Sequence, residues 1–322
     1  MARFLIRRIL QGIFVLLLMT FTIYAIFFLG PGPQFVARAL AGKSAGPAQV
    51  RRIATQLWLD KPWYQAYWHF LTQALHGNLG FDYYHNVPVT TSIAAAAPIT
   101  ISLVIGASLL WLAMGLATGI LSAVKTRSLL DRFFTTQALF FYSMPTFVLG
   151  LLFILILYSF LTSHGVAIFP APDSWTPFSQ NPLSWAHDLI LPWFTVALVS
   201  AATYTRLTRG SMLDVFGEDY IRTARSKGMS ERRVILRHNL RASLTPIVTQ
   251  FGLDVGVLLG GAVITETVFA LPGLGYTAVQ AINEQDLPLI MGIVLVASAA
   301  VVIANLVVDI FYAVLDPRVR IH

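Results

Sequence analysis

Residues 289–313 read LIMGIVLVASAAVVIANLVVDIFYA and hold one charged side chain, that of Asp309, in 25 positions. A helix needs about 20 mostly apolar residues to cross the hydrocarbon core of a bilayer. Helices of soluble proteins keep a polar face toward water, and this stretch has none. We therefore predict that it forms a membrane-spanning helix.

The same pattern recurs five times upstream. The further predicted spans are residues 9–30, 99–124, 133–161, 188–209 and 244–269. The fourth has the weakest pattern, because Pro192, Thr203 and Arg206 interrupt it. Of the 322 residues, 56% are hydrophobic and 11% are charged, whereas soluble domains are about a quarter charged. The sequence predicts an all-α polytopic membrane protein with six transmembrane helices.

The Lys and Arg residues predict how these spans are oriented. Six spans put both termini on one side, which holds 17 of the 22 basic residues, nine of them in the stretch 206–241. Because Lys and Arg accumulate in cytoplasmic loops, we expect both termini and the loop at 210–243 to be cytoplasmic. The net charge of +7 then follows from topology, and no nucleic-acid partner is expected.

The first apolar segment could also be a signal peptide, since Ala39-Leu40-Ala41 resembles a cleavage site. Its apolar stretch exceeds the 7–15 residues of a signal-peptide core, so we expect a retained helix. The predicted organisation is a cytoplasmic tail and first span at 1–30, an external helical loop at 31–98, a transmembrane core at 99–313 that includes the loop 210–243, and a cytoplasmic tail at 314–322.

The predicted external loop is too long for a simple connector and should have its own structure. Apolar residues from Ala48 to Leu75 approximate a helical stripe, which Asp60-Lys61-Pro62 interrupts. The aromatic residues of this region allow two interpretations: an interfacial belt at the membrane surface, or a docking surface for an external partner. They are Trp58, Trp63, Tyr64, Tyr67 and Trp68.

The loop at 210–243 is polar and basic, yet its pattern is that of a helix–turn–helix. Glu218 through Lys227 are good helix formers, and Gly228 suits the left-handed position that follows a helix. Ser230 can start a second helix, which we expect to end before Pro246. A flexible linker would hold more Gly, Ser and Pro, so we expect a rigid loop.

No catalytic or metal site is predicted. Cys is absent, which excludes disulfides and thiolate chemistry. His69 and His76 share roughly one helical face but lack a third ligand. Gly42-Lys43-Ser44 lacks the upstream Gly of a P-loop, and residues 273–278 fit G-x-G-x-x-A without the βαβ unit that this motif requires. We therefore expect this chain to bind no nucleotide, metal or other cofactor.

The fifth predicted span carries glycines and carboxylates. Gly252, Gly256 and Gly260 recur every four residues, which places them on one helical face suited to close helix packing. This face could pack within the same chain or form a pore with a second subunit. Asp254 and Glu266 lie in or near the same span, and such carboxylates usually face protein or water. A structural role and a transport role for Asp254 both stay open.

The stretch EDYIRTARSKG at 218–228, with HNLR at 238–241, resembles the cytoplasmic EAA loop of bacterial ABC importer permeases. Nearly the whole chain is similar to the B-type permease subunits of dipeptide and oligopeptide transporters. Other matching pieces are FLIRR at 4–8, LDKP at 59–62, GNLG at 77–80, ETVF at 266–269, PGLG at 272–275 and LDPR at 315–318. The chain departs from the family pattern at 222–224, where Arg-Thr-Ala replaces Glu-Ala-Ala, at Arg241, and at Pro31-Gly32-Pro33, which lacks an Asp.

The resemblance implies a type I importer core formed by spans two to six, in the cytoplasmic (inner) membrane of a bacterium. It implies a heterodimer with a homologous C-type permease, two cytoplasmic ABC ATPase domains and an external substrate-binding protein, all surrounded by membrane lipid. ATP and Mg would bind the ATPase subunits, and this chain would be no enzyme. The implied substrates are di- and oligopeptides, although close relatives are thought to carry glutathione, haem or nickel chelates.

The resemblance also assigns site residues. ATP-driven closure of the ATPases would move the helices of 218–241 as levers, a rigid-body switch of the pore, with Met229, Arg232, Arg233 and Leu236 at the ATPase surface. The expected coupling residues are Glu218, Tyr220, Ala224, Arg225, Lys227, Gly228, Arg232, Arg233, His238 and Arg241. The expected residues of the translocation path or of subunit packing are Gly252, Asp254, Gly256, Gly260 and Glu266.

A proton-coupled secondary transporter that uses Asp254 and Glu266 is the main alternative. Such transporters carry polar sites in internal repeats, whereas only one span here offers paired carboxylates. A membrane-embedded hydrolase would need a nucleophile and a base, and the sequence identifies no such pair.

Overall fold

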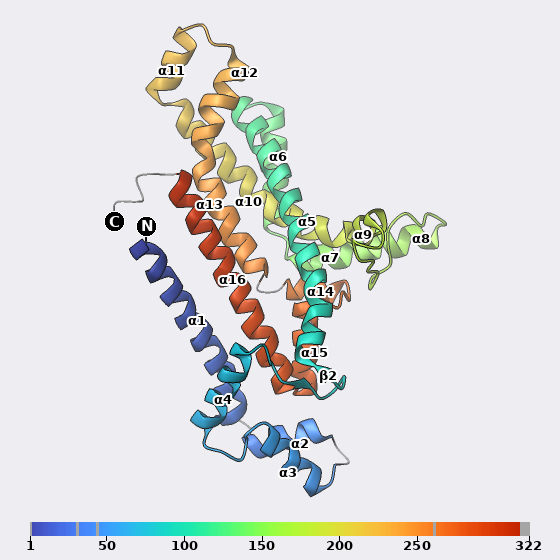
Figure 1. Cartoon of the computed structure of the whole chain (residues 1–322). Helices are drawn as coiled ribbons and strands as arrows, with labels where there is room; N and C mark the ends of the chain where they lie inside the picture. Colours follow the sequence, from blue (N-terminus) through green and yellow to red (C-terminus); the bar gives the residue numbers. More distant parts are fainter. Residues whose placement is uncertain (1, 30–31, 43–44, 260–261, 316–322) are drawn as a thin grey trace. The chain divides into compact units, whose positions relative to one another are not determined.

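The computed structural model describes residues 2–29, 32–42, 45–259 and 262–315 (Figure 1). Within these residues, five helices are long and apolar enough to cross a membrane, and a bent helix pair would make a sixth. They are Ile6–Ile26, Val89–Val124, Thr146–Ser163, Glu231–Leu259 and Leu287–Val307, with the pair Pro182–Asp188 and Ile190–Phe216. The predicted all-α polytopic fold is confirmed. Lys43, Ser44, Pro31 and the segment 316–322 lie outside the described residues.

The backbone divides into two compact units, of which the first comprises Met1–Ile101, Leu259–Glu266 and Pro272–Ile303. Its short β-hairpin pairs Phe81 with Pro88 and Asp82 with Val87. Its elements are α1 (Ala2–Leu29), α2 (Pro33–Ala41), α3 (Pro47–Gln56), α4 (Trp63–Leu75), β1 (Phe81–Asp82), β2 (Val87–Pro88), the start of α5 (Val89–Val124), the start of α14 (Val263–Val268), α15 (Leu274–Glu284) and most of α16 (Leu287–Leu315).

The segment between α1 and α5 has its own hydrophobic core. Val36 of α2, Ile53 of α3 and Ala66 of α4 are buried in one cluster, with Leu59 from the corner between α3 and α4. Pro47 occupies the first turn of α3, where its missing N–H costs nothing. The predicted helical stripe is therefore two helices, broken where the sequence has Asp-Lys-Pro.

Asp286 forms the corner between α15 and α16. Its carboxylate accepts hydrogen bonds from the backbone N–H of Leu289 at 3.0 Å and from that of Tyr83 at 2.8 Å. The first bond caps α16 in the manner of an N-terminal Asp. The second ties the hairpin to the same corner.

The second unit comprises Ser102–Leu258, Thr267–Leu271 and Ala304–His322. Besides the remaining parts of α5, α14 and α16, its elements are α6 (Leu129–Tyr142), α7 (Thr146–Phe153), the π-helical η1 (Ile154–Phe160), α8 (Leu161–Ser163), α9 (Pro182–Asp188), α10 (Ile190–Phe216), α11 (Asp219–Ser226), α12 (Glu231–Arg233), the π-helical η2 (Val234–Asn239) and α13 (Leu240–Leu259).

Two predicted spans of this unit are interrupted. The span predicted at 133–161 is broken between Tyr142 and Thr146, because Pro145 has no N–H and restricts the residue before it. Figure 1 shows the chain changing direction between α6 and α7. The fourth span is bent by 55° where α9 meets α10, and α10 runs past the predicted end at 209 to Phe216.

The fifth predicted span differs more. The helix expected to end before Pro246 continues through it, so Glu231–Leu259 is one helix of 29 residues. A proline inside a helix removes one backbone hydrogen bond, which membrane helices tolerate. The expectation of a continuous span at 244–269 was also wrong, because α13 ends at Leu259 and α14 begins separately at Val263.

Candidate coupling loop and membrane-level site

The loop between α10 and α13 turns at Gly228, whose φ is +74°. The Gly228 N–H donates to the carbonyl of Arg225 at 2.9 Å, and the Met229 N–H donates to that of Ala224 at 3.3 Å. These two bonds form the Schellman arrangement that ends many helices. The predicted placement of Gly228 at a helix end is confirmed, and its conformation favours glycine over residues with a side chain.

Figure 1 shows α11 and α12 as the two arms of this loop. A small apolar core joins α11 to η2, which follows α12. Ile221, Ala224 and Val234 are buried in it, and Met229 and Phe216 pack against it. Met229, expected at the ATPase surface, is partly buried because its side chain packs against this core. Ala224 is 7% exposed and belongs to the same core instead of the outer surface.

An ion pair reinforces the core on its solvent side. The Arg225 Nε donates to Glu231 Oε1 at 3.0 Å, and the guanidinium lies 5.5 Å from the ring centroid of Phe216. Arg225 thus links α11, α12 and the end of α10. The other expected coupling residues are exposed, except His238, which is half-buried; they are Glu218, Tyr220, Lys227, Gly228, Arg232, Arg233 and Arg241, together with Leu236.

The loop is also fastened to the spans that carry it. Asn239, at the end of η2, is fully buried, and its Nδ2 donates to the carbonyl of Met212 in α10 at 3.0 Å. The Ser243 hydroxyl donates to the carbonyl of Ser211 at 3.3 Å. Since α10 and α12–α13 continue from the loop into the predicted spans, these bonds brace two helices at the point where they leave the loop.

A second brace joins α10 to α6. The Arg209 guanidinium donates to both carboxylate oxygens of Asp131, Nε to Oδ1 at 2.8 Å and Nη2 to Oδ2 at 3.0 Å. The Arg127 N–H also donates to Asp131, at 2.8 Å. The hydrogen bonds from Arg209 hold the pKa of Asp131 at about 2, although burial opposes them. The Asp131 carboxylate is therefore ionised at every physiological pH.

Gly256 of the glycine face packs within the chain. A Cβ added there would lie 2.9 Å from the Asn305 side-chain oxygen and 3.9 Å from the Ala304 Cβ, both on α16. Gly252 is buried as well, and Gly260 lies outside the described residues. This contact matches the alternative in which the glycines admit a helix of the same chain.

Asp254 is held by two neutral donors. The Tyr204 hydroxyl donates to its Oδ2 and the Gln250 amide donates to its Oδ1, each at 2.8 Å. Tyr204 is fully buried on α10 and lies beside Trp111, with ring centroids 6.2 Å apart. Asp254 therefore joins α13 to α10, as its structural interpretation expects.

Glu266, in the first unit, is buried within a network of hydrogen bonds. It is fully buried and accepts bonds from the Thr100 hydroxyl at 2.6 Å and from the Tyr276 N–H at 2.9 Å. The Thr100 oxygen in turn accepts the Leu274 N–H at 2.8 Å. A Cβ on Gly273 would lie 2.5 Å from the Glu266 carboxyl carbon, so PGLG needs glycine there to admit the carboxylate.

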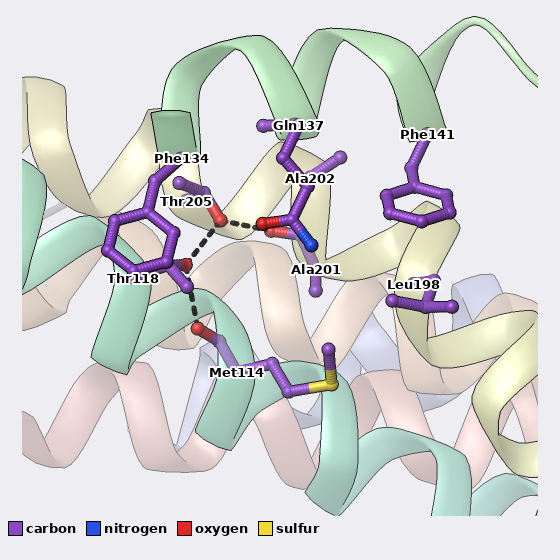
Figure 2. Close-up of a pocket in the computed structure, with 10 residues that line it drawn as sticks. Met114, Thr118, Phe134, Gln137, Phe141, Leu198, Ala201, Ala202 and Thr205 are labelled. Atoms are coloured by element: carbon purple, nitrogen blue, oxygen red, sulfur yellow. Dashed lines mark hydrogen bonds between the residues drawn. The ribbon is translucent and has the colours of Figure 1, made fainter. Parts of the chain in front are cut away.

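Figure 2 shows a small cavity in the second unit, between α5, α6 and α10. The hydroxyls of Thr118 and Thr205 lie 2.7 Å apart at its edge, and the Gln137 amide enters from α6. Its volume of about 30 Å³ has room for one or two water molecules and not for a peptide. Its other lining residues are Met114, Phe134, Ala138, Phe141, Leu198, Ala201 and Ala202.

Comparison with known proteins agrees with this arrangement. The family of binding-protein-dependent transport system inner membrane components matches residues 115–321, and the family of the N-terminal part of such components matches residues 1–104. The chain belongs to this family. It is 36% identical over 321 residues to the glutathione transport system permease protein GsiC of Escherichia coli K12, and 34% identical over 342 residues to the dipeptide transport system permease protein DppB of the same strain, with 99% of each chain covered.

Family membership determines the kind of protein. This permease is an integral inner-membrane transport subunit of an ABC importer and not an enzyme, and importers of this kind combine permeases with ATPases and a binding protein. The proton-coupled transporter and the hydrolase are thereby set aside. The bonds around Asp254 and Glu266 agree, because each carboxylate already has two partners.

Three partner residues of the permease were missed by the sequence reasoning. Asp131 has a local signal, since the Ser128 hydroxyl accepts the Asp131 N–H at 3.2 Å in the spacing of a helix-start motif. Nothing in the sequence links Asp131 to Arg209, which entered the sequence analysis only as one of the basic residues that predict the topology. Thr100 and Tyr204 have no signal beyond being polar within apolar helices.

Proposed function

We propose that this permease pairs with a homologous C-type permease to import di- or oligopeptides that an external binding protein delivers. The relatives named for glutathione and dipeptide transport support a peptide-like substrate. ATP and Mg belong to two cytoplasmic ATPase domains, and this chain holds no cofactor.

The observation that carries this proposal is the continuity of the coupling loop with two spans. Residues 190–216 and 231–259 each run unbroken from the loop into an apolar span, and Asn239 bonds one to the other. When the ATPases close against α11 and α12, both helices move together as a rigid body. The exposed side chains of Arg232, Arg233 and Leu236 form the surface that the ATPases contact.

The proposed orientation puts this loop and both termini in the cytoplasm and residues 31–98 outside. The Cys-free chain permits a direct test with single cysteines and a membrane-impermeant thiol reagent. We expect His76→Cys to react in intact cells and Ser230→Cys to react only after permeabilisation. The reverse result would overturn the orientation.

The function is tested with a labelled dipeptide and the reconstituted importer, which contains both permeases, the ATPases and the binding protein. Gly228→Val forces a branched side chain into a left-handed backbone conformation and should misdirect α12. We expect normal membrane insertion, with peptide uptake and substrate-stimulated ATP hydrolysis both reduced by about tenfold or more, since a 1–3 kcal/mol strain is a factor of that order.

Gly210→Ala is the matched control. Gly210 lies inside α10, has no positive φ, and a Cβ there would meet nothing within 4 Å, so this variant should behave as the wild type. Wild-type levels of peptide uptake and substrate-stimulated ATP hydrolysis in Gly228→Val would contradict the lever mechanism. A wild-type importer that hydrolyses ATP but takes up no peptide would instead contradict the proposed substrate class.

A further inference from the structure

Helix α4 rests on α1 at membrane depth. The Tyr67 hydroxyl donates to the carbonyl of Leu17 at 3.0 Å, and the Tyr67 ring packs on those of Phe21 and Tyr24, with centroids 5.5 Å and 5.4 Å apart. Leu17, Phe21 and Tyr24 all lie within the candidate span Ile6–Ile26. From Leu17 to Tyr24 a helix rises about 10 Å, so α4 follows α1 well below the end of that span.

The exposed face of α4 is aromatic. Trp63, Tyr64 and Trp68 are 45%, 54% and 67% exposed, although Trp63 also touches Phe21, with ring centroids 5.9 Å apart. Trp and Tyr concentrate where a membrane meets water. Since α4 also contacts a membrane span, this pattern favours the interfacial belt over a protein-docking surface.

A cavity of about 240 Å³ lies behind α4 in the same unit. Its apolar wall includes Leu57 and Leu59 from the corner after α3, Ala66 and Phe70 of α4, and Met291 of α16. Tyr24 and Met291 belong to candidate membrane spans. The cavity therefore reaches from the segment 33–88 to the level of the bilayer.

The polar lining of this cavity holds no Asp, Glu, Lys or Arg among the described residues. Its side chains with polar groups are Tyr24, Gln56, His69, Gln73 and Asn78. Asn78 Nδ2 donates to Gln73 Oε1 at 3.1 Å, which leaves the Gln73 Nε2 group to donate elsewhere. A free peptide carries charged termini, and burying them without a counter-charge is costly. An ester group needs only such neutral donors.

Trp58 fixes one side of this lining. Its ring stacks on that of His69, with centroids 4.2 Å apart and planes at 5°. Its backbone has a φ of +57°, a conformation that is strained for a bulky residue and recurs at functional sites. The stacking thus holds the imidazole at the cavity in a set orientation.

We propose that this cavity binds an acyl chain of a glycerophospholipid from the leaflet that surrounds the C-terminal half of α1. The chain packs among Leu57, Ala66, Phe70 and Met291, and the ester group meets His69 and Gln73. The bound lipid fills the space between α1, α4 and α16. The proposed orientation, with residues 31–98 outside, makes this the outer leaflet. Only that assignment of the leaflet rests on the proposed function.

The test uses the complete importer in vesicles of phosphatidylethanolamine and phosphatidylglycerol, doped with a phospholipid that carries a photoreactive diazirine on one acyl chain. After illumination without ATP or peptide, mass spectrometry locates the labelled residues. We expect labelling of Phe70 and Met291. Because no transport is measured, this result is readable even if peptide import fails.

Ala66→Phe on α4 and Met291→Trp on α16 each fill the cavity, and either should lower labelling about fivefold or more. Leu75→Phe adds similar bulk on α4 at a position that is 86% exposed and outside the cavity lining, so its labelling should equal that of the wild type. Undiminished labelling in a filling variant that assembles would overturn the proposal. The proposal would also be overturned if N-acetylphenylalanine amide displaced the label and excess phospholipid did not. That result would assign the cavity to a polypeptide segment.

Discussion

Asp131 and Asp286 are both buried carboxylates that join two elements, yet the protein treats their charges in opposite ways. Asp131, 5% exposed, ties α6 to α10 through the Arg209 guanidinium. Asp286, 1% exposed, ties α16 to the hairpin through backbone N–H groups and lies near the carboxylate of Asp82. The pKa of Asp131 is lowered to about 2 by Arg209, whereas burial raises that of Asp286 to about 6.

The difference shows that burial alone does not set the charge of a carboxylate. A guanidinium that donates twice outweighs the cost of desolvation, whereas three neutral backbone N–H donors do not. The Asp131 brace stands beside the helices that carry the coupling loop and keeps its charge at any working pH. The carboxyl group of Asp286 instead keeps its proton until the pH rises through about 6.

The largest expected effect is that of Arg209→Met. It would leave the Asp131 charge buried without its partner, a change that costs about 3 kcal/mol. We expect a clear drop in the apparent melting temperature of the solubilised importer. Arg222→Met is the control, because the Arg222–Asp219 pair is 3.7 Å apart and its side chains are 73% and 97% exposed, so its loss should change little. Equal effects of the two variants would contradict the comparison.

Asp131→Asn should cost less, about 2 kcal/mol at neutral pH, because Arg209 is 30% exposed and can be hydrated. A lowered pKa stabilises the fold above the unfolded value, and this stabilisation is lost as the pH falls toward the folded value of about 2. The melting-temperature gap between wild type and variant should therefore shrink below about pH 4. A gap that stays constant down to pH 3 would reject the assigned role of Arg209.

Asp286→Asn should show the opposite pH trend. Asn still caps α16 but cannot accept the Tyr83 N–H, a loss of about 1 kcal/mol. A raised pKa stabilises the fold fully below the unfolded value, and this stabilisation disappears as the pH rises through about 6. The wild type should gain in melting temperature over the variant as the pH is lowered from 7 to about 4. A pH-independent difference would mean that burial does not raise the pKa of Asp286.

Asp254→Asn should have the smallest effect. Its two donors, the Tyr204 hydroxyl and the Gln250 amide, are neutral, and an amide oxygen can still accept from one of them. We expect uptake of labelled dipeptide to fall by about threefold or less, the cost of one hydrogen bond. Abolished uptake with intact assembly would show that transport needs the negative charge.

Local signals predicted much of this fold. The spans followed from length and apolar character, and the turn at Gly228 followed from one residue with unusual backbone freedom. The prolines show the limit of local reasoning, since Pro145 separates two helices and Pro246 lies within one. Around Pro246 the helix is held by its neighbours: Ile247 is fully buried and Ser243 bonds to the carbonyl of Ser211. A proline removes one hydrogen bond, and tertiary packing decides whether the helix continues.

The polar partners could not be predicted from the sequence. Asp131 and Arg209 are separated by 78 positions, and Thr100 and Glu266 by 166. Periodicity shows which face a side chain occupies on its own helix, but not which helix comes to lie against that face. The glycine pattern predicted a close contact for Gly256, whereas its neighbour Asn305 became known only from the structure.

The π-helical segment Val234–Asn239 determines how the side chains of the loop are rotated about the helix axis relative to those of the fifth span. A π turn closes its hydrogen bonds one residue later than an α turn, and one residue corresponds to about 100° of rotation. The directions of Arg232 and Arg233 are therefore offset from those of Gly252 and Gly256 by that angle, relative to an unbroken α-helix. Rewinding of this one segment would rotate the loop about the helix axis while the membrane-embedded part kept its facing. The buried bond from Asn239 to Met212 anchors the end of the segment about which such a rotation would occur.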